Sequence, residues 1–359
     1  MQPTVFDRIR ARFFYSNSAT GITVVSVFLL AVAAFYLVDW GILSAVFRAD
    51  HDACYQARGA CWGFVAEKWR LILFGRYPYE DQWRPALATF AIVAMLIVSA
   101  WPRMWTRVGA KIALWGWAAA LLIFFGLMYG GFWGLEFVAT DSWGGFPLTV
   151  ILTLLGIGVS TPIGIVLALG RRSSLPVVKL LSTGYIELVR GVPLITVLFV
   201  ASFIFPLLLP SGVRIDPFWR VAGGIILFQA AYMAETVRGG LQTIRQGQYL
   251  AADSLGLSAF QKYVYVILPQ ALVAIIPSFV NNLLSMFMDT SLVTVVSMFD
   301  LTGSLQLALG DAAWRDFFRE GYIFVAAIYF FCSLIMSRYS QWLESRLQSG
   351  TRRSAALRH

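Results

Sequence analysis

Long apolar runs separated by short polar segments dominate the chain. A helix needs about 20 apolar residues to cross the ~30 Å hydrocarbon core of a membrane, because its backbone polar groups must be satisfied internally. Eight runs approach that length: Gly21–Phe47, Pro85–Ala100, Ile112–Gly130, Leu148–Leu169, Tyr185–Leu209, Phe218–Val237, Ala271–Met288 and Tyr322–Met336. The second is short and Pro277 interrupts the seventh, so seven or nine spans also fit the pattern. The predicted fold is an all-α, polytopic membrane bundle of about eight helices.

The first run is too long for a cleavable signal peptide, and no small-residue cleavage site follows it. We therefore expect it to remain in the protein as a membrane span.

The amino-acid composition supports the prediction of a membrane protein. Of 359 residues, 58% are hydrophobic and 13% are charged, whereas soluble domains carry about 25% charged residues. The net charge of +9 comes from short basic clusters beside the apolar runs. Membrane topology produces that arrangement, so we expect a lipid bilayer as the partner and no nucleic acid.

The distribution of basic residues predicts the orientation. If the N-terminus is cytoplasmic, Lys and Arg concentrate on the cytoplasmic side, including Arg8, Arg10 and Arg12 at the start and Arg352, Arg353 and Arg358 at the end. Most of the basic residues on the periplasmic side fall in the segment 48–84. Long segments are translocated across the membrane largely independently of their charge. Both termini are therefore expected in the cytoplasm.

Three cysteines are compatible with this topology. Cys54 and Cys61 lie in the outside segment 48–84, where an oxidising periplasm permits a disulfide; two unpaired thiols are the alternative. Cys332 lies in the last span and is expected to pack as a small core residue.

The polar content of the spans changes along the chain. The first three spans are rich in Ala, Trp and Phe, whereas from Leu148 onward Gly, Pro, Asn, Ser and ionisable residues interrupt the apolar runs. Polar groups within lipid are costly, so their concentration marks the functional part. We expect residues 1–140 to form extra N-terminal helices with a periplasmic loop at 48–84. Residues 147–340 would form a five-helix transport core, and residues 341–359 a basic cytoplasmic tail.

The cytoplasmic connection at 239–269 is longer than a helix connection requires. Gly256 suits the left-handed position that ends a helix, and Ser258 with Gln261 forms a capping box that begins the next one. Pro269 is expected to mark a turn toward the membrane. Two short helices joined at a glycine would suit the docking of a partner protein.

Four segments resemble the permeases of ABC importers. The pattern Gly-Gln-x-x-Ala-Ala-x-x-Leu-Gly-Leu-Ser from Gly247, followed by Ile-Leu-Pro-Gln-Ala, is similar to the EAA loop of that family. Glu-Leu-Val-Arg-Gly-Val-Pro-Leu from Glu187 resembles the Glu-x-x-Arg-Gly-Thr-Pro-Leu segment of polar amino-acid permeases. Ala-Glu-Thr-Val-Arg-Gly-Gly around Glu235 and Met-Asp-Thr-Ser-Leu from Met288 are also similar to that branch. With its extra spans, the chain most resembles one of the two permeases of general L-amino-acid importers.

The resemblance implies a type I importer permease with a five-helix core and three extra N-terminal helices. The residues it implies for coupling to an ATPase are Gly247, Ala251, Ala252, Asp253, Gly256 and Pro269. Leu250 stands where the family usually has glutamate, so no salt bridge is expected there. Val192 replaces a usual threonine, and Met288 replaces a lysine that could have met the substrate.

The same resemblance implies the partners and the reaction. They are a second, homologous permease, a pair of ATPase subunits and a periplasmic amino-acid-binding protein. ATP and Mg would be bound by the ATPase, and no cofactor by this chain. L-Amino acids of polar or broad range would move from the periplasm to the cytoplasm by alternating access.

Two pairs of opposite charge lie near helix ends. Glu187 and Arg190 are three residues apart, as are Glu235 and Arg238, so each pair shares a helix face. Local ion pairing and a cytoplasmic gate are both compatible with this spacing.

The seventh predicted span carries a polar stripe. Its members are Ser278, Asn282, Ser285 and Asp289 at helical offsets, with Asn281 beside them and Thr290 and Ser291 following. Polar side chains in a span face protein or water. A substrate path, a subunit interface held by hydrogen bonds, and plain packing therefore remain open. Pro277 predicts a kink in this span.

Enzyme chemistry finds little support in the sequence. The histidines are His51, in the outside segment, and His359, and no Gly-x-x-x-x-Gly-Lys-Ser/Thr phosphate-binding loop occurs. We expect neither a metal site nor catalysis. An ion-coupled secondary transporter with Asp289 as its ion site is the main alternative, and a scaffold or membrane-anchored enzyme is a third.

Overall fold

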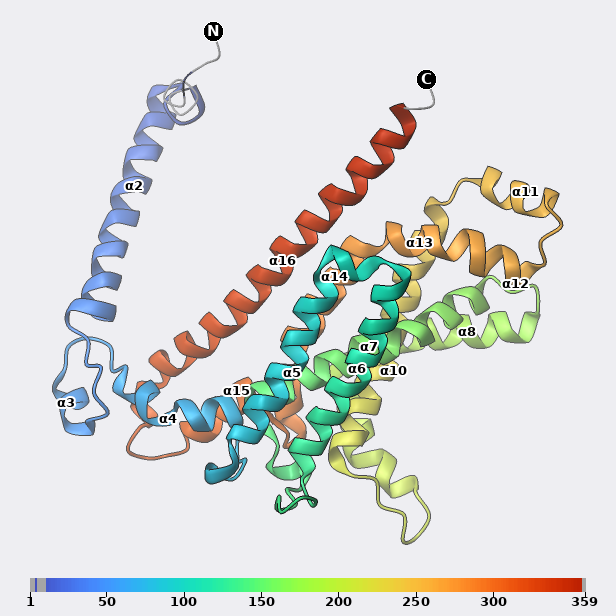
Figure 1. Ribbon diagram of the computed structural model, residues 1–359. Coiled ribbons are helices and arrows are strands. Elements are labelled where there is room, and N and C mark those ends of the chain that lie inside the picture. Colours follow the sequence, from blue (N-terminus) through green and yellow to red (C-terminus); the bar gives the residue numbers. More distant parts are fainter. Residues whose placement is uncertain (1–3, 5–10, 357–359) are drawn as a thin grey trace. The chain divides into compact units, whose positions relative to one another are not determined.

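The computed structural model describes residue 4 and residues 11–356, with side chains described as far as Arg346 (Figure 1). Arg8, Arg10, Arg358 and His359 lie outside the described residues, as do the side chains of Arg352 and Arg353. The longer helices are α2 (Asn17–Val38), α4 (Gly63–Phe74), α5 (Trp83–Ala100), α6 (Arg107–Tyr129), α7 (Gly145–Arg171), α8 (Pro176–Arg190), α10 (Pro217–Thr243), α11 (Gln246–Ser254), α14 (Ile276–Asp289), α15 (Leu301–Ala308) and α16 (Phe318–Ala356).

Short elements connect these helices. The short α-helices are α3 (His51–Gln56), α9 (Leu194–Phe199), α12 (Ala259–Gln261) and α13 (Leu268–Ala274), and the strand β1 covers Phe299–Asp300. The π-helical turns are η1 (Asp39–Leu43), η5 (Val200–Ile204) and η7 (Lys262–Ile267). The 3₁₀ turns are η2 (Tyr79–Asp81), η3 (Pro102–Trp105), η4 (Thr140–Ser142), η6 (Phe205–Leu208), η8 (Thr290–Val296) and η9 (Arg315–Phe317).

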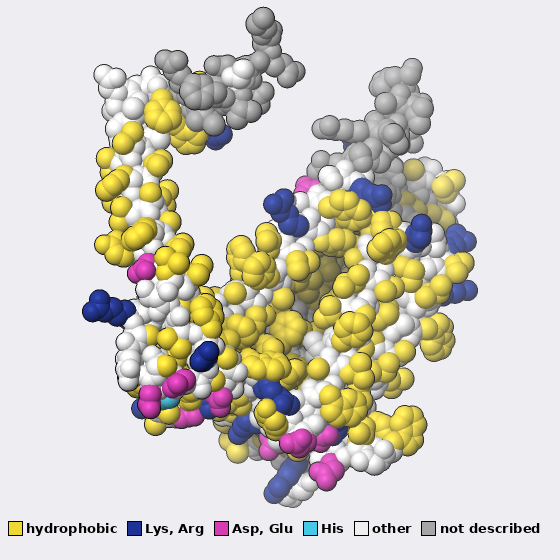
Figure 2. Space-filling view, turned by 60° about the vertical axis from the view of Figure 1, so that its left-hand side comes forward, with side chains coloured by type: hydrophobic (Ala, Val, Ile, Leu, Met, Phe, Trp, Pro, Cys, Tyr) yellow, Lys and Arg dark blue, Asp and Glu magenta, His cyan; other side chains and the backbone are white. Residues whose placement is uncertain are grey.

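In the described part of the chain, six helical segments are long and apolar enough to cross a membrane, or up to seven if one bent pair is a single span. The bent pair joins Pro176–Arg190 to Leu194–Leu208 at 104° and corresponds to the fifth predicted span. The sixth predicted span is α10, which is 27 residues long but carries Arg220, Glu235 and Arg238 and is not among the six. The all-α membrane bundle is confirmed, and the predicted number of about eight spans is close to the observed one. Figure 2 shows hydrophobic side chains over most of the visible helical surface, with charged side chains gathered toward helix ends.

The chain forms two compact units. The first comprises Met1–Trp69 with Leu309–Phe324, and the second comprises Arg70–Ala308 with Val325–His359. The two units are defined by contacts between residues. The predicted boundary near residue 140 instead separates helices with few polar residues from helices with many. Helix α16 begins in the first unit and continues into the second.

Contacts between the segment that holds Cys54 and Cys61 and the segment Leu309–Phe324 hold the first unit together. Cys54 and Cys61 form a disulfide with Cα atoms 5.3 Å apart, and the amide of Cys61 donates to Glu320 Oε1 at 2.8 Å. The Lys68 ammonium donates to Asp311 at 2.7 Å and lowers the pKa of that carboxyl. The rings of His51, Tyr55, Phe64, Trp314 and Phe317 pack beside these contacts. By contrast, α2 has no buried residue.

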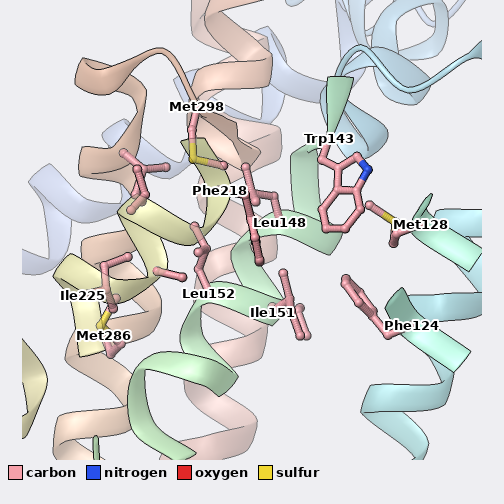
Figure 3. Packing of buried hydrophobic residues seen from close by; sticks show 14 of the residues in the cluster. Phe124, Met128, Trp143, Leu148, Ile151, Leu152, Phe218, Ile225, Met286 and Met298 are labelled. Atoms are coloured by element: carbon pink, nitrogen blue, oxygen red, sulfur yellow. The ribbon is translucent and has the colours of Figure 1, made fainter. Parts of the chain in front are cut away.

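The core of the second unit joins the extra helix α6 to the transport helices. Phe124 and Met128 of α6 pack near Trp143, and α7 contributes Leu148, Ile151 and Leu152 (Figure 3). The other labelled residues are Phe218, Ile225, Met286 and Met298. Helices α7 and α10 approach closely, since a Cβ at Gly164 would lie 2.6 Å from the Cβ of Met233. Small residues at such crossings let helix backbones pack together within a membrane.

The predicted kink near Pro277 is confirmed. Helix α13 ends at Ala274, α14 begins at Ile276, and Pro277 lies in the first turn of α14. Proline is tolerated in a first helical turn because the amide it lacks would have no partner there.

Candidate functional site

The connection at 239–269, called the coupling loop below, contains the predicted pair of short helices. Helix α11 ends in a Schellman motif, in which the amides of Gly256 and Leu257 donate to the carbonyls of Asp253 and Ala252 at 2.9 and 3.2 Å. Gly256 has a φ of +70°, which confirms the predicted left-handed position. Ser258 and its N3 residue then form both bonds of the predicted capping box.

The predicted turn at Pro269 is wrong. The chain stays helical from Ala259 to Ala274, through α12, η7 and α13, and Pro269 lies in the first turn of α13. Proline lacks an amide hydrogen and its ring collides with the carbonyl four residues earlier in a regular α-helix. The π-helical turn η7 immediately before it changes the hydrogen-bond pattern there, so the helix continues without a break.

The coupling loop presents apolar side chains on its outer surface. Leu250 is 59% exposed, Leu255 77% and Phe260 71%. Exposed apolar side chains in a polar connection call for a partner surface. In the sequence, Leu250 stands out only as the replacement of a usual glutamate, and Leu255 and Phe260 do not stand out. All three lie in a loop with few charges, which is the feature that could have identified them.

The inner side of the same loop packs against the transport helices. Ala252 is buried, and Ile267 and Ala271 belong to a cluster with Val237 and Leu241 of α10. Asp253 forms an ion pair with Lys262 at 2.6 Å, which ties α11 to η7. Gly247, Ala251 and Gly256 are exposed, and the space around Gly247 and Gly256 is open. Helix α11 contacts η7, which continues into α13, and α13 packs against α10.

The charged residues near the helix ends form one network across three helices. Glu235 of α10 lies 3.5 Å from Arg171 of α7 and 3.6 Å from Arg190 of α8. It also accepts a hydrogen bond from Arg238 Nε at 2.9 Å, which confirms that pair. Arg171 in turn contacts Glu187 at 2.8 Å.

The predicted pairing of Glu187 with Arg190 is wrong. Both lie on α8, but Glu187 contacts Arg171, whereas Arg190 contacts Glu235. Interhelical partners are closer than the local one because α7 and α10 both pack against α8. Arg171 was missed, since it lies 16 residues from Glu187 and no local spacing identifies it.

The residues of the polar stripe do not all face the same way: some contact other parts of the chain and others are exposed. Asn282 donates to Thr236 Oγ1 of α10 at 2.8 Å, and Thr290 is buried and donates to the carbonyl of Phe287. The exposed members are Ser278, Asn281 and Ser285, and the half-buried ones are Asp289 and Ser291. A row of exposed polar side chains on a membrane span is expected to face another protein surface or water. The stripe as a substrate path or as a subunit interface stays a prediction.

Within the described residues, no group of three or more His, Cys, Asp or Glu side chains could hold a metal ion. The arrangement therefore offers a contact surface, an ion-pair network and a polar helix face.

Known proteins are similar to this chain in sequence and, over part of its length, in fold. The model of the family described as "Binding-protein-dependent transport system inner membrane component" matches residues 160–349. The chain is similar to the inner membrane amino-acid ABC transporter permease protein YhdY of Escherichia coli (strain K12). They are 44% identical over 345 residues, which cover 95% of this chain and 93% of that protein.

Two further proteins are similar. The first is the glutamate/glutamine/aspartate/asparagine transport system permease protein BztC of Rhodobacter capsulatus. It is 38% identical over 348 residues, which cover 82% of this chain and 80% of that protein. The second is a solved structure described as an amino acid ABC transporter with histidines. It has 32% identity and a TM-score of 0.51, and the match covers 56% of this chain and 92% of that chain.

Proposed function

Because this chain belongs to the binding-protein-dependent transport family, and is a multi-pass permease subunit of an amino-acid ABC importer, we propose that it imports L-amino acids by alternating access. Its substrates are polar or broad in range and move from the periplasm to the cytoplasm. The name of the similar protein BztC, which refers to glutamate, glutamine, aspartate and asparagine, supports polar substrates. Both termini lie in the cytoplasm, as the distribution of basic residues indicates.

The coupling loop carries this proposal. Leu250, Leu255 and Phe260 form an exposed apolar surface that docks on a separate ATPase, which binds ATP and Mg. ATP-driven closure of the ATPase pair moves α11, and the packing of Tyr249 and Ala271 against the cluster around Val237 transmits that motion to α10. Reversing the equilibrium between the two access states from 1:99 to 99:1 requires about 5.5 kcal/mol of differential binding. The loop must therefore keep its conformation while it transmits the motion of the ATPase. The capping box and the Schellman motif supply that rigidity.

The substrate path lies along α14. Ser278, Asn281 and Ser285 face a space that this chain shares with a second, homologous permease, and Asp289 and Ser291 extend it. A periplasmic binding protein delivers the amino acid to this pair. The interhelical contact of Asn282 fixes the orientation of α14 against α10.

Uptake in proteoliposomes tests the proposal. The chain, its candidate partner permease, the ATPase and the binding protein are reconstituted together, and uptake of a panel of labelled amino acids is measured. We expect uptake that requires both ATP and the binding protein. Uptake driven by an ion gradient without the ATPase would instead support a secondary transporter that uses Asp289.

The role of the exposed stripe residues Ser278, Asn281 and Ser285 can be tested by introducing a charged side chain among them. Ser285→Lys is expected to lower uptake about tenfold or more, because it puts a cation into the proposed path. The ATPase and the second permease should still co-purify with the variant. Ser345→Lys, on an exposed part of α16, is the matched control and should transport normally. Loss of the second permease from the Ser285→Lys complex would assign the stripe to the subunit interface.

A further inference from the structure

Cations at the ends of the membrane helices differ in their partners. In the transport core, Arg171, Arg190, Arg238 and Lys262 each contact a carboxylate. A second group is exposed, and within the described residues its side chains have no ion pair or hydrogen bond: Arg103, Arg107, Lys111 and Arg338. These four belong to the α5–α6 connection, the first turns of α6 and the end of the last span.

Aromatic contacts hold these segments together, although they are far apart in sequence. The Tyr339 hydroxyl donates to the carbonyl of Ala100 at 3.1 Å, across a separation of 239 residues. The ring centroids of Trp105 and Trp342 are 6.2 Å apart, and those of Tyr339 and Trp342 are 5.6 Å apart. The Arg346 guanidinium lies over Trp342, with Cζ 4.8 Å from the ring centroid. All of these residues belong to the second compact unit. We call Arg103, Trp105, Arg107, Lys111, Arg338 and Trp342 the basic–aromatic surface.

Three candidate spans place this surface at the edge of the bilayer. The connection 101–106 joins the spans Tyr79–Ala100 and Arg107–Tyr129, and the span Arg315–Arg346 ends in the same place. Tryptophan and tyrosine favour the depth of the lipid headgroups, because their rings are amphipathic. Cations held at that depth without a carboxylate partner lie next to the phosphate groups of the lipid.

We propose that the basic–aromatic surface binds the phosphate of an anionic phospholipid headgroup. The guanidinium groups of Arg103 and Arg107 and the ammonium of Lys111 supply donors from one side, and Arg338 supplies them from the other. Basic sites between membrane helices bind anionic headgroups in this way. Topology alone explains cations on this side of the membrane. It does not explain why Arg103, Arg107 and Arg338 lie on segments that the contact between Trp105 and Trp342 brings together where three spans meet.

Such a lipid links the extra helices to the transport core. One headgroup contacts the α5–α6 connection and α16 together, and so adds to the contact between Tyr339 and Ala100. This role is independent of which amino acid is carried, and its test requires no transport.

Lipid binding by the purified importer complex tests the proposal. Binding of phosphatidylglycerol and of phosphatidylcholine is measured by native mass spectrometry for the wild type and for Arg103→Gln/Arg338→Gln. We expect the wild type to prefer phosphatidylglycerol and the variant to lose about tenfold or more of that preference. Lys179→Gln/Arg214→Gln removes two exposed cations elsewhere and should retain it.

Three outcomes would overturn the proposal. They are equal binding of the two lipids by the wild type, an unchanged preference in Arg103→Gln/Arg338→Gln, and an equal loss in the control variant. Competition with inorganic phosphate separates the two sources of the anion. Displacement of phosphatidylglycerol at millimolar phosphate would assign the surface to a soluble anion instead of the membrane.

Discussion

Gly256→Val is expected to reduce ATP-driven uptake to about a tenth of the wild-type rate or less, while the chain still inserts into the membrane. Gly256 has a φ of +70°, and a left-handed conformation costs about 1–2 kcal/mol for a residue with a Cβ, more for a β-branched one. The space around Gly256 is open, so the effect comes from the backbone and not from a collision. A valine would break the Schellman motif and displace Phe260 relative to Leu250 and Leu255.

The measurement is uptake together with ATP hydrolysis in proteoliposomes. Gly256→Asn is the matched control, because asparagine tolerates the left-handed region, and we expect it to retain most of the uptake. Full uptake by Gly256→Val would show that the shape of this loop does not matter for coupling.

Glu235→Gln is expected to lower the stability of the complex by about 1–3 kcal/mol and to reduce uptake. Glu235 contacts three guanidinium groups, those of Arg171, Arg190 and Arg238, and they would be left close together without its charge. The four side chains are 25–35% exposed, so solvent screens part of their repulsion and keeps the expected loss below that of a fully buried pair.

Thermal unfolding of the purified complex and uptake are measured together. Glu187→Gln is the control: Glu187 is 58% exposed and contacts Arg171, so the loss should be about 1 kcal/mol or less. Removing one of the cations as well, in Glu235→Gln/Arg190→Gln, should restore part of the stability. Equal losses in Glu235→Gln and Glu187→Gln would contradict the central place of Glu235. A stable Glu235→Gln complex that hydrolyses ATP without transport would favour a gate over simple ion pairing.

Features that depend on neighbouring residues could be predicted from the sequence. The apolar runs identify the membrane helices, because crossing lipid demands about 20 apolar residues whatever the fold. The capping box at Ser258 and the left-handed Gly256 depend on residues within a few positions of each other. The same holds for the kink at Pro277, where the helix break is local.

Features that depend on helix packing could not be predicted. Arg171 contacts Glu187 and Glu235 only because α7, α8 and α10 pack together, and the spacing of three residues wrongly suggested a Glu187–Arg190 pair. Helical offsets grouped Asn282 with Ser278 and Ser285, but Asn282 contacts Thr236 of α10, whereas the two serines are exposed. At Pro269 the rule that proline ends a helix failed, because a π-helical turn lies immediately before it.

The first unit also bears on how the protein is made. Its disulfide-bonded segment is completed by Glu320, which accepts the amide of Cys61, and by Trp314, which packs against Phe64. A ribosome must therefore synthesise nine-tenths of the chain, roughly, before this unit can close. Until then Phe64 and the amide of Cys61 lack these partners. A chain truncated before residue 309 lacks Trp314 and Glu320 altogether, so in such a chain the disulfide-bonded segment cannot make these two contacts.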